Sequence, residues 1–364
     1  MAWFEAPLAN VAWRHKLPKL SPFLVGGFAL IGVLDGYAIQ RESSSAHTAV
    51  VAAQGGDPYA RPASVPTPAD NKPTAARVEL GKMLFFDPRL SSSGWISCST
   101  CHNPALGWSD GLPTAIGHGM KVLRRATPSI YNAAYNPLQM WDGRFATLEE
   151  QALGPIGAAG EMNQPLPELI ERLSAIEGYL NAFDKAYPGE GVSGKTIGKA
   201  IAAFERTVVG TLAPFDRWRK GERNAISASA QRGFRIFEGK ANCIACHTGY
   251  NFTDNGFHNV GLKSAGGEED PGRFAIKKVK SNLGAFKTPT LRNIALTAPY
   301  MHNGAYRTLE EVVDHYDRGG DAKENLSPNM KPLNLSAQEK TDLVEFMKTL
   351  TGKHMPMVVP QLPN

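Results

Sequence analysis

Two short motifs of cysteine and histidine are the residues of this sequence best suited to chemistry. CSTCH occupies residues 98–102, and CIACH occupies residues 243–247. In a Cys-x-x-Cys-His motif two thiols add to the vinyl groups of one heme, while the adjacent imidazole reaches the iron. All four cysteines lie in these motifs, so none is left for a disulfide. The motifs therefore predict two covalently bound c-type hemes. Their expected ligands are Cys98, Cys101 and the iron ligand His102 for the first heme, and Cys243, Cys246 and the iron ligand His247 for the second.

An internal repeat follows each heme motif. The stretch TPSIYNAAYNPLQMWDGRFATLEE (127–150) aligns without a gap with TPTLRNIALTAPYMHNGAYRTLEE (288–311), at a constant offset of 161 residues. Self-similarity at a fixed offset indicates repeated structural units. The sequence therefore predicts two related cytochrome c-like heme domains, at 74–210 and 211–352, followed by a tail at 353–364.

The sixth ligand of each iron separates an electron carrier from a catalyst. An iron with two strong protein ligands passes electrons, whereas an open position binds a small molecule. Within the repeat, Phe145 takes the position that Tyr306 takes in the second copy. Phenylalanine cannot bind iron, but a tyrosinate can. We therefore expect one open heme and one heme closed by Tyr306, unless Met301 or Met330 is the ligand instead.

The elements that must position these residues read mostly as helices. Apolar residues recur at helical spacing in 74–86, 166–187 and 195–210, and Ser336 with Glu339 has capping-box spacing at the start of a further helix. In 166–187 the expected buried face consists of Leu169, Leu173, Ile176, Leu180 and Phe183. Strand-like alternation is scarce. The predicted fold is mainly α, with long loops rich in glycine and proline.

The N-terminal residues indicate export. An apolar run of fourteen residues, 21–34, follows several basic residues, and it is shorter than the roughly 20 residues of a membrane span. We expect residues 1–38 to be a signal peptide or signal anchor, and the Ser-, Ala- and Pro-rich residues 39–73 to be a flexible linker. Both alternatives place the rest of the protein in the periplasm, either soluble after cleavage or tethered to the inner membrane.

The order and spacing of these motifs resemble the bacterial diheme cytochrome c peroxidase/MauG superfamily over residues 74–352. In that family the N-terminal heme reacts with hydrogen peroxide, and the C-terminal heme stores or delivers electrons. Typical peroxidases of the family have methionine at the position of Tyr306. The sequence is similar to the Tyr-ligated branch, which includes MauG, MbnH and BthA.

The resemblance also assigns catalytic residues. Trp141 in WDGR matches the tryptophan between the hemes, Gln151 a distal-pocket glutamine and Pro155 the distal proline. Glu161 matches the catalytic distal glutamate, which would move a proton between the two oxygens of peroxide. From the residues alone, the alternatives are a core aromatic at Trp141, loop packing at Gln151 and Pro155, and a surface carboxylate at Glu161.

Two further positions bear on the ligands. His118 matches a loop histidine that caps the first heme in resting Met-type peroxidases, but Tyr-type members keep that heme accessible, so ligation by His118 stays open. The inter-domain calcium site of the family uses an asparagine where this sequence has Ala126. Backbone carbonyls near Lys287 and Pro289 are the remaining oxygen donors for one calcium ion.

The resemblance implies an oxidoreductase in which peroxide reacts at the His102 heme. The oxidising equivalents would be shared through Trp141 with the His247/Tyr306 heme, as a bis-Fe(IV)-like state. The expected partners are hydrogen peroxide and a protein electron donor or protein substrate. No dense run of Lys or Arg suggests nucleic acid at a net charge of +5, and a membrane would be reached only through the N-terminal anchor.

Two other functions stay open. One is a conventional cytochrome c peroxidase that removes peroxide with electrons from a small redox protein. The other is a non-catalytic diheme electron-transfer cytochrome, which would need a strong sixth ligand on both irons. His118 is the best candidate for that ligand at the first heme.

Overall fold

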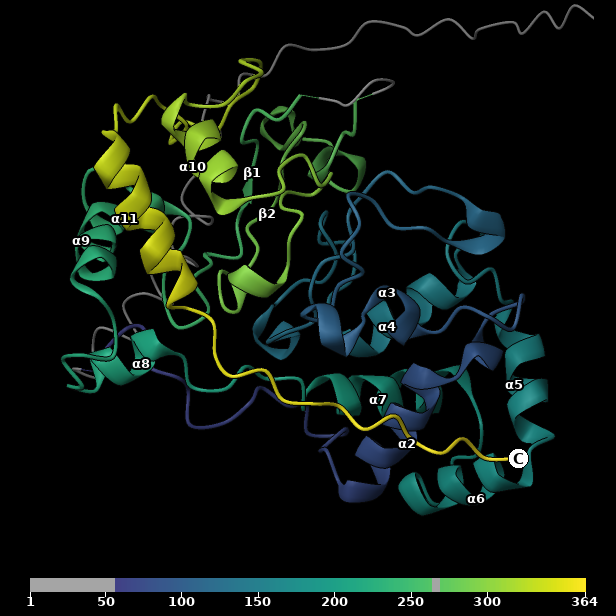
Figure 1. The fold of residues 1–364 in the computed structure, drawn as a ribbon. Coiled ribbons are helices and arrows are strands. Elements are labelled where there is room, and N and C mark those ends of the chain that lie inside the picture. Colours follow the sequence, from purple (N-terminus) through teal and green to yellow (C-terminus); the bar gives the residue numbers. More distant parts are fainter. Residues whose placement is uncertain (1–55, 264–268) are drawn as a thin grey trace, which may run out of the picture. The chain divides into compact units, whose positions relative to one another are not determined.

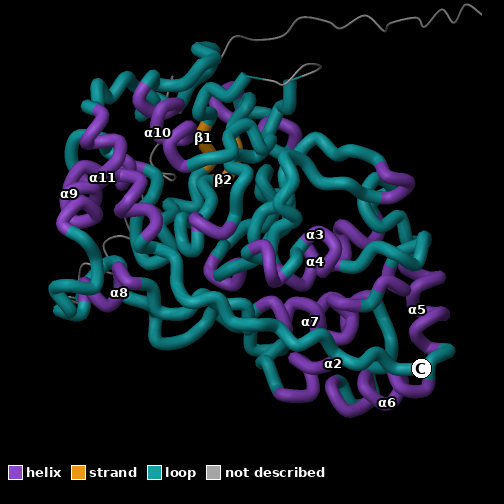
Figure 2. Tube along the Cα trace, viewed as in Figure 1, coloured by secondary structure: helices purple, strands orange, loops and turns teal. Residues whose placement is uncertain are grey.

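The computed structural model describes residues 56–263 and 269–364 (Figure 1). Helices and loops dominate it, and the described part contains one small antiparallel sheet, in which Phe257 lies opposite Lys287 (Figure 2). The elements are α2 (Ala75–Phe86), α3 (Cys98–Cys101), α4 (Leu148–Gly157), α5 (Leu166–Ser174), α6 (Glu177–Ala186), α7 (Gly194–Glu205), α8 (Pro214–Arg219), α9 (Ala228–Glu238), β1 (Phe257–His258), β2 (Phe286–Lys287), α10 (Leu309–Asp317) and α11 (Ala337–Lys348). The prediction of a mainly helical fold with long loops is confirmed.

The expected signal or anchor at 1–38 lies outside the described residues. Within the described residues, we find no helix with the length and apolar character needed to span a bilayer.

Two hydrophobic clusters organise the helices. In the first, α2 and α7 pack together with α4, α5 and α6, and the rings of Phe85 and Phe204 lie 5.1 Å apart. In the second, α9 and α11 pack together with α8 and α10, and the rings of Phe234 and Phe346 lie 5.2 Å apart. Each fully buried phenylalanine contributes about 1.5–3 kcal/mol through burial of its apolar surface.

A glycine permits the central helix crossing in each cluster. Gly81 on α2 lies against the carbonyl of Ala200 on α7, and Gly233 on α9 lies against the carbonyl of Asp342 on α11. A Cβ atom at either glycine would overlap with that carbonyl oxygen. The two crossings are therefore built in the same way, as expected for related domains.

The predicted repeat is also visible in the backbone. Asn132 and Asn293 occupy matching positions and both have left-handed conformations, with φ of 59° and 61°, which asparagine tolerates well. The Asn132 Oδ1 atom accepts a hydrogen bond from the Gly210 amide (3.1 Å), and the Asn293 Oδ1 atom accepts one from the Gly352 amide (3.0 Å). Each repeat copy is thus tied to the segment that follows the last helix of its own half. The structure confirms two cytochrome c-like domains, whereas their limits stay a prediction.

The single helix expected over 166–187 is wrong. Two helices, α5 and α6, occupy this range, because Ile176 adopts an extended conformation (φ −104°, ψ 107°) between them. The break changes which side chains face the core: Tyr179 and Phe183 are fully buried, while Leu180 is 45% exposed.

Part of the expected flexible linker packs on the two clusters. Tyr59 is buried in the second cluster, and its hydroxyl donates to Glu238 (3.0 Å). Asn71 is fully buried and donates to the Glu149 carboxylate on α4 (2.7 Å). Residues 56–73 therefore follow the surface of the helices, in contrast to the expectation from their composition.

The C-terminal tail crosses from the second half to the first. It runs from α11 past α7 to the neighbourhood of α6 (Figure 1). The Lys353 carbonyl accepts a hydrogen bond from the Thr211 hydroxyl (2.9 Å), and the Pro363 carbonyl accepts one from the Arg89 guanidinium (2.9 Å). The tail thus connects the two halves.

Candidate active site

The first Cys-x-x-Cys-His motif forms the short helix α3 and the residue after it. The Ser97 amide donates to the Thr100 hydroxyl (2.9 Å), and the His102 amide donates to the Cys98 carbonyl (2.8 Å), so the motif is closed into one turn. The Nδ1 atom of His102 lies 3.1 Å from the Trp108 carbonyl. Burial lowers the pKa of His102, which favours the neutral imidazole. A proton on Nδ1, donated to the Trp108 carbonyl, would leave the Nε2 lone pair for a heme iron.

The second motif repeats this arrangement. The His247 amide donates to the Cys243 carbonyl (2.8 Å), and Nδ1 of His247 lies 2.9 Å from the Phe252 carbonyl. Burial lowers the pKa of His247 as well. Trp108 and Phe252 both have positive φ angles, 62° and 49°, which turn their carbonyls toward the histidines.

These residues fit two c-type hemes. The four cysteines are free thiols, and burial raises the pKa of Cys101 to about 11. Each histidine offers an Nε2 lone pair, and a backbone carbonyl on the other nitrogen fixes the tautomer, as is usual for a metal-bound histidine. The sequence analysis did not identify Trp108 and Phe252. Trp108 follows His102 by six residues, and Phe252 follows His247 by five.

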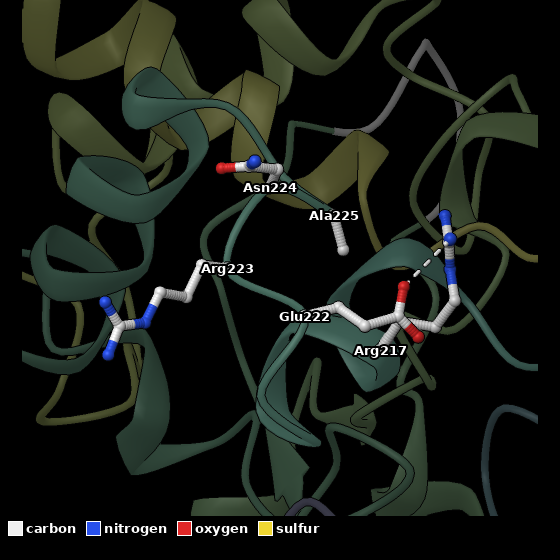
Figure 3. A pocket seen from close by; sticks show the side chains of 5 residues that line it. All are labelled: Arg217, Glu222, Arg223, Asn224 and Ala225. Atoms are coloured by element: carbon white, nitrogen blue, oxygen red, sulfur yellow. Dashed lines mark hydrogen bonds and ion pairs between the residues drawn. The ribbon is translucent and has the colours of Figure 1, made fainter.

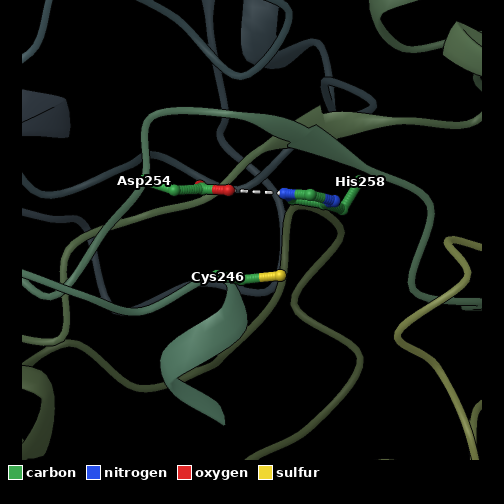
Figure 4. Close-up of side chains that lie close together, drawn as sticks. All are labelled: Cys246, Asp254 and His258. Carbon is green, nitrogen blue, oxygen red and sulfur yellow. Dashed lines mark hydrogen bonds and ion pairs between the residues drawn. The ribbon is translucent and has the colours of Figure 1, made fainter. Parts of the chain in front are cut away.

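A third group of side chains lies beside the second motif. Ligand atoms of Cys246, Asp254 and His258 lie within 4.8 Å of one another, and His258 Nε2 is 2.8 Å from Asp254 Oδ2 (Figure 4). The Cys246 thiol is required for heme attachment, so this group belongs to the second heme site and does not form a separate metal site.

Helix α4 and the turn after it carry three of the expected catalytic residues. Gln151 and Pro155 lie on α4, and Gln151 Nε2 donates to the Met140 sulfur (3.7 Å). Glu161 lies in the turn, where its amide donates to the Ala158 carbonyl (2.9 Å). Burial raises the pKa of Glu161, and the side chain is within electrostatic reach of Cys101. Glu161 is thus a partly buried carboxyl beside the first heme motif.

Trp141 lies where the two halves meet. Its indole nitrogen donates to the Ala126 carbonyl (2.9 Å), and its ring lies 6.4 Å from the ring of His302, nearly edge-on. His302 is the residue that matches Trp141 at the repeat offset. It stacks on Phe286 with a ring separation of 3.5 Å. Equivalent residues of the two halves therefore contact each other, and the sequence analysis missed His302.

Tyr306 takes part in a hydrogen-bond network in the second half. Its hydroxyl donates to Asp321 Oδ2 (2.8 Å) and lies 2.9 Å from Nδ1 of His315. His315 is fully buried, and its Nε2 lies 2.8 Å from the Val260 carbonyl. Burial and the hydrogen bond to Asp321 raise the pKa of Tyr306 to about 12. His315 and Asp321 were not expected from the sequence.

In the first half, the positions that match Tyr306 and His315 are occupied by an apolar residue and a glycine. Phe145 stands at the position of Tyr306, and Gly154 on α4 stands at the position of His315 on α10. The Phe145 ring packs so closely on Gly154 that a Cβ atom there would lie 2.7 Å from it. Neither residue offers a ligand atom from its side chain. The two halves therefore share a backbone but differ in the groups at this position.

The loop histidine His118 is bound through its backbone to the turn that carries Glu161. Its amide donates to the Glu161 carbonyl (2.8 Å), and its Nδ1 atom lies 3.3 Å from the Ser92 hydroxyl. The bond to Glu161 means that the His118 loop and the expected catalytic glutamate are fixed to each other.

The side chains near Ala126 do not fit a calcium site. The Ala126 carbonyl is occupied by Trp141, and its amide donates to the His302 carbonyl (2.7 Å). Lys287 is buried, and its amide donates to the Trp141 carbonyl (2.8 Å). Burial lowers the pKa of Lys287 to about 8, and neither Ala126 nor Lys287 has a side-chain oxygen that could bind a divalent cation.

A surface hollow after α8 lies apart from these residues. Its lining consists of Arg217, Glu222, Arg223, Asn224 and Ala225, and Arg217 is paired with Glu222 at 3.2 Å (Figure 3). It contains none of the expected site residues.

Comparison with known proteins agrees with this arrangement. Residues 75–224 match the model of the di-haem cytochrome c peroxidase family, and residues 230–351 match that of cytochrome c. The chain is 48% identical to the methylamine utilization protein MauG of Methylorubrum extorquens, over 84% of this chain and 86% of MauG. It is 39% identical to the cytochrome c551 peroxidase of Pseudomonas aeruginosa, over 78% of this chain and 81% of that enzyme.

The fold has a solved counterpart. The crystal structure of a MauG-like protein associated with microbial copper homeostasis matches with a TM-score of 0.75 and 35% identity, over 81% of this chain and 94% of that chain. With two heme motifs on a repeated cytochrome c-like scaffold, the chain belongs to the di-haem cytochrome c peroxidase and MauG family, and it is a peroxidase-type enzyme with two hemes.

Proposed function

We propose that this enzyme reduces hydrogen peroxide at the heme of His102 and draws the electrons from the heme of His247 and Tyr306, in the periplasm. When bound, the two hemes supply the redox chemistry: they deliver two electrons to peroxide and hold the two oxidising equivalents between them. A protein donor or protein substrate then returns two electrons.

The difference between the two matching positions carries this proposal. In the second half, Tyr306 brings a phenol oxygen together with His315 and Asp321, whereas the first half has Phe145 and Gly154. The Tyr306 oxygen would close the iron of the second heme, and the lack of a side-chain donor at Phe145 and Gly154 would leave space for a small molecule at the first. A two-heme peroxidase needs this asymmetry between its hemes, whereas an electron carrier does not.

Glu161 is the group best placed to move protons. Reduction of one peroxide to two waters consumes two electrons and two protons. A carboxylate beside the first heme can take the proton from the oxygen nearer the iron and give it to the leaving oxygen. Burial raises the pKa of Glu161 toward the working pH, which favours such a transfer. Gln151 would orient the peroxide by hydrogen bonding, and Pro155 would keep other ligands out.

Trp141 is the residue proposed to connect the two hemes. Its indole lies between the Ala126 carbonyl and the ring of His302, at the contact between the halves. An aromatic ring fixed at such a contact shortens the distance an electron has to travel. The ring of His302 continues this contact to Phe286 and β2.

Export to the periplasm rests on two features of the sequence. Covalent attachment through Cys-x-x-Cys-His is a modification of exported cytochromes, and the apolar run at 21–34 has the length of a signal sequence. Calcium has no place in the proposal, because of the poor fit near Ala126. Treatment of the holoenzyme with a chelator should therefore leave its spectrum and its rate unchanged, and a loss of either would restore a calcium site.

An optical titration with peroxide tests the proposal. The ferric holoenzyme should show high-spin bands, and one equivalent of peroxide should change the absorption of both hemes. Two inert low-spin hemes would instead support a non-catalytic electron-transfer cytochrome. Conventional peroxide removal is the second candidate, favoured by the likeness to cytochrome c551 peroxidase. Rapid turnover with a small redox protein and no other oxidised product would identify it.

A further inference from the structure

A loop of the second half combines exposed lysines with exposed apolar side chains. We name residues 274–284 the lysine loop. Lys277, Lys278 and Lys280 are all exposed, and between and after them Ile276, Val279 and Leu283 are 47%, 46% and 43% exposed. Single exposed apolar residues are ordinary. Three of them within eight positions, surrounded by positive charge, indicate a binding surface.

The lysine loop has a defined shape. Its ends form the 3-10 turns Arg273–Ala275 and Lys280–Asn282. Asn325 donates from its side chain to the carbonyls of Lys280 (3.0 Å) and Leu283 (2.8 Å). These hydrogen bonds hold the loop in place, so its apolar side chains are presented to solvent by a fixed backbone.

Residues on both sides of the lysine loop are attached to the turn that carries Trp141. The Arg273 guanidinium donates to the carbonyls of Asp142 and Gly143, each at 2.8 Å, and the Lys287 amide donates to the Trp141 carbonyl (2.8 Å). Through β2 the same segment pairs with β1, whose His258 lies next to Cys246 (Figure 4). A molecule on the lysine loop would therefore sit close to both the proposed electron bridge and the second heme.

The lysine loop itself is positively charged. Residues 274–284 contain three exposed lysines and no acidic side chain. Of the two acidic residues described just before this region, Asp270 is bound by Arg125 (2.8 Å) and Glu269 is exposed. In the neighbouring segment, the positive charge of Lys323 and the negative charge of Glu324 cancel in the net charge. Within the part of the chain that the structure describes, we find no carboxylate paired with Lys277, Lys278 or Lys280.

We propose that the lysine loop is the docking surface for an acidic redox protein that serves as the electron donor, an inference that rests on the proposed function. Two donor molecules would each give up one electron, and one peroxide would take these electrons with two protons to form two waters. Opposite charges would steer the encounter. The three apolar side chains would form the small dry centre that weak electron-transfer complexes have.

Charge reversal with a matched control tests this docking surface. We would compare the triple variant Lys277→Glu/Lys278→Glu/Lys280→Glu with Lys72→Glu/Lys185→Glu/Lys220→Glu, in which three exposed lysines elsewhere are replaced. Both variants have the same net charge. The probes are an acidic blue copper protein and a basic c-type cytochrome, and the dissociation constant of each for the ferric holoenzyme is measured by calorimetry without peroxide.

We expect the loop variant to bind the acidic probe about tenfold more weakly than the control variant at low salt, with the difference lost near 1 M salt, where screening is nearly complete. Equal affinities of the two variants, or tighter binding of the basic probe by the wild type, would overturn the docking surface. Peroxide turnover with hydroquinone is measured separately. A wild type that fails in that assay contradicts the proposed function, whatever the binding result.

Discussion

Replacement of Glu161 by glutamine tests the proton transfer directly. The substitution keeps the size of the side chain and removes the group that can exchange a proton. Burial raises the pKa of Glu161 because the charged form has lost solvation. Glutamine avoids that cost, so the variant should fold at least as well as the wild type and retain both hemes.

The expected loss of rate follows from the surroundings of Glu161. Positioned acid–base groups contribute about 10²–10⁴-fold to a rate, or about 2.7–5.4 kcal/mol of activation free energy. Asp110 is the other carboxylate within electrostatic reach of Cys101, but it already accepts a hydrogen bond from Thr127 (2.6 Å). Since Asp110 is engaged, it cannot readily replace Glu161. We expect the second-order rate constant for peroxide to fall about 10³-fold, near the middle of that range.

The pH dependence gives a second sign of the same role. The base form of Glu161 has to be present before it can accept a proton, so the wild-type rate should rise with pH as the carboxyl ionises. Because the pKa is raised, the inflection should lie above the ordinary value of about 4.3. The variant should lack this inflection.

Stopped-flow mixing with peroxide measures both quantities, and Glu168→Gln on the exposed face of α5 is the control. A variant that reacts at the wild-type rate with the same pH profile would refute proton transfer by Glu161. An altered resting spectrum would instead show that Glu161 shapes the heme site itself.

Three other changes test separate parts of the structure. Tyr306→Phe leaves Asp321 without its phenol partner, and should keep both hemes while shifting the resting spectrum of one; an unchanged spectrum would remove Tyr306 from the iron. Trp141→Phe loses the hydrogen bond to the Ala126 carbonyl. It should slow the oxidation of the second heme at least tenfold after peroxide addition. Simultaneous oxidation of both hemes at the original rate would place the electron bridge elsewhere. Gly233→Ala forces α9 away from α11 and should lower the free energy of unfolding by about 1–3 kcal/mol, measured by denaturant titration; unaltered stability would mean that this crossing is not tight.

Local sequence patterns predict where a helix begins, which of its faces is buried and which backbone turns are repeated. The capping box of Ser336 and Glu339 begins α11, and Ile197, Ile201, Phe204 and Val208 are all buried as their spacing suggests. The repeat offset of 161 residues predicts matching backbones, and the left-handed Asn132 and Asn293 show that match. Such features depend on neighbours in the chain.

Features that depend on distant contacts were not accessible to the same reasoning. The apolar spacing in 166–187 is compatible with one helix or two, and the extended Ile176 decides between them. Tyr59 stands in a stretch with the composition of a linker, yet an aromatic cluster far along the chain buries it. A repeat also pairs Trp141 with His302 in an alignment, but contact between them is a property of how the halves pack.

The candidate site also combines residues that the sequence predicts with residues that only the structure identifies. The heme ligands follow from two motifs, whereas the carbonyls that orient the histidines come from residues without a recognisable pattern, Trp108 and Phe252. His315 and Asp321 come from α10 and the turn after it, and the three-dimensional structure is needed to place them at Tyr306. Their importance could have been suspected from the repeat, since glycines stand at the matching positions.

Electron paramagnetic resonance of the resting ferric holoenzyme tests the central asymmetry most directly. Phe145 and Tyr306 predict two inequivalent centres: one high-spin iron that binds an added small ligand, and one iron that does not. Substitution of Tyr306 should change only the second signal. Two identical low-spin signals, both insensitive to an added ligand, would contradict the account.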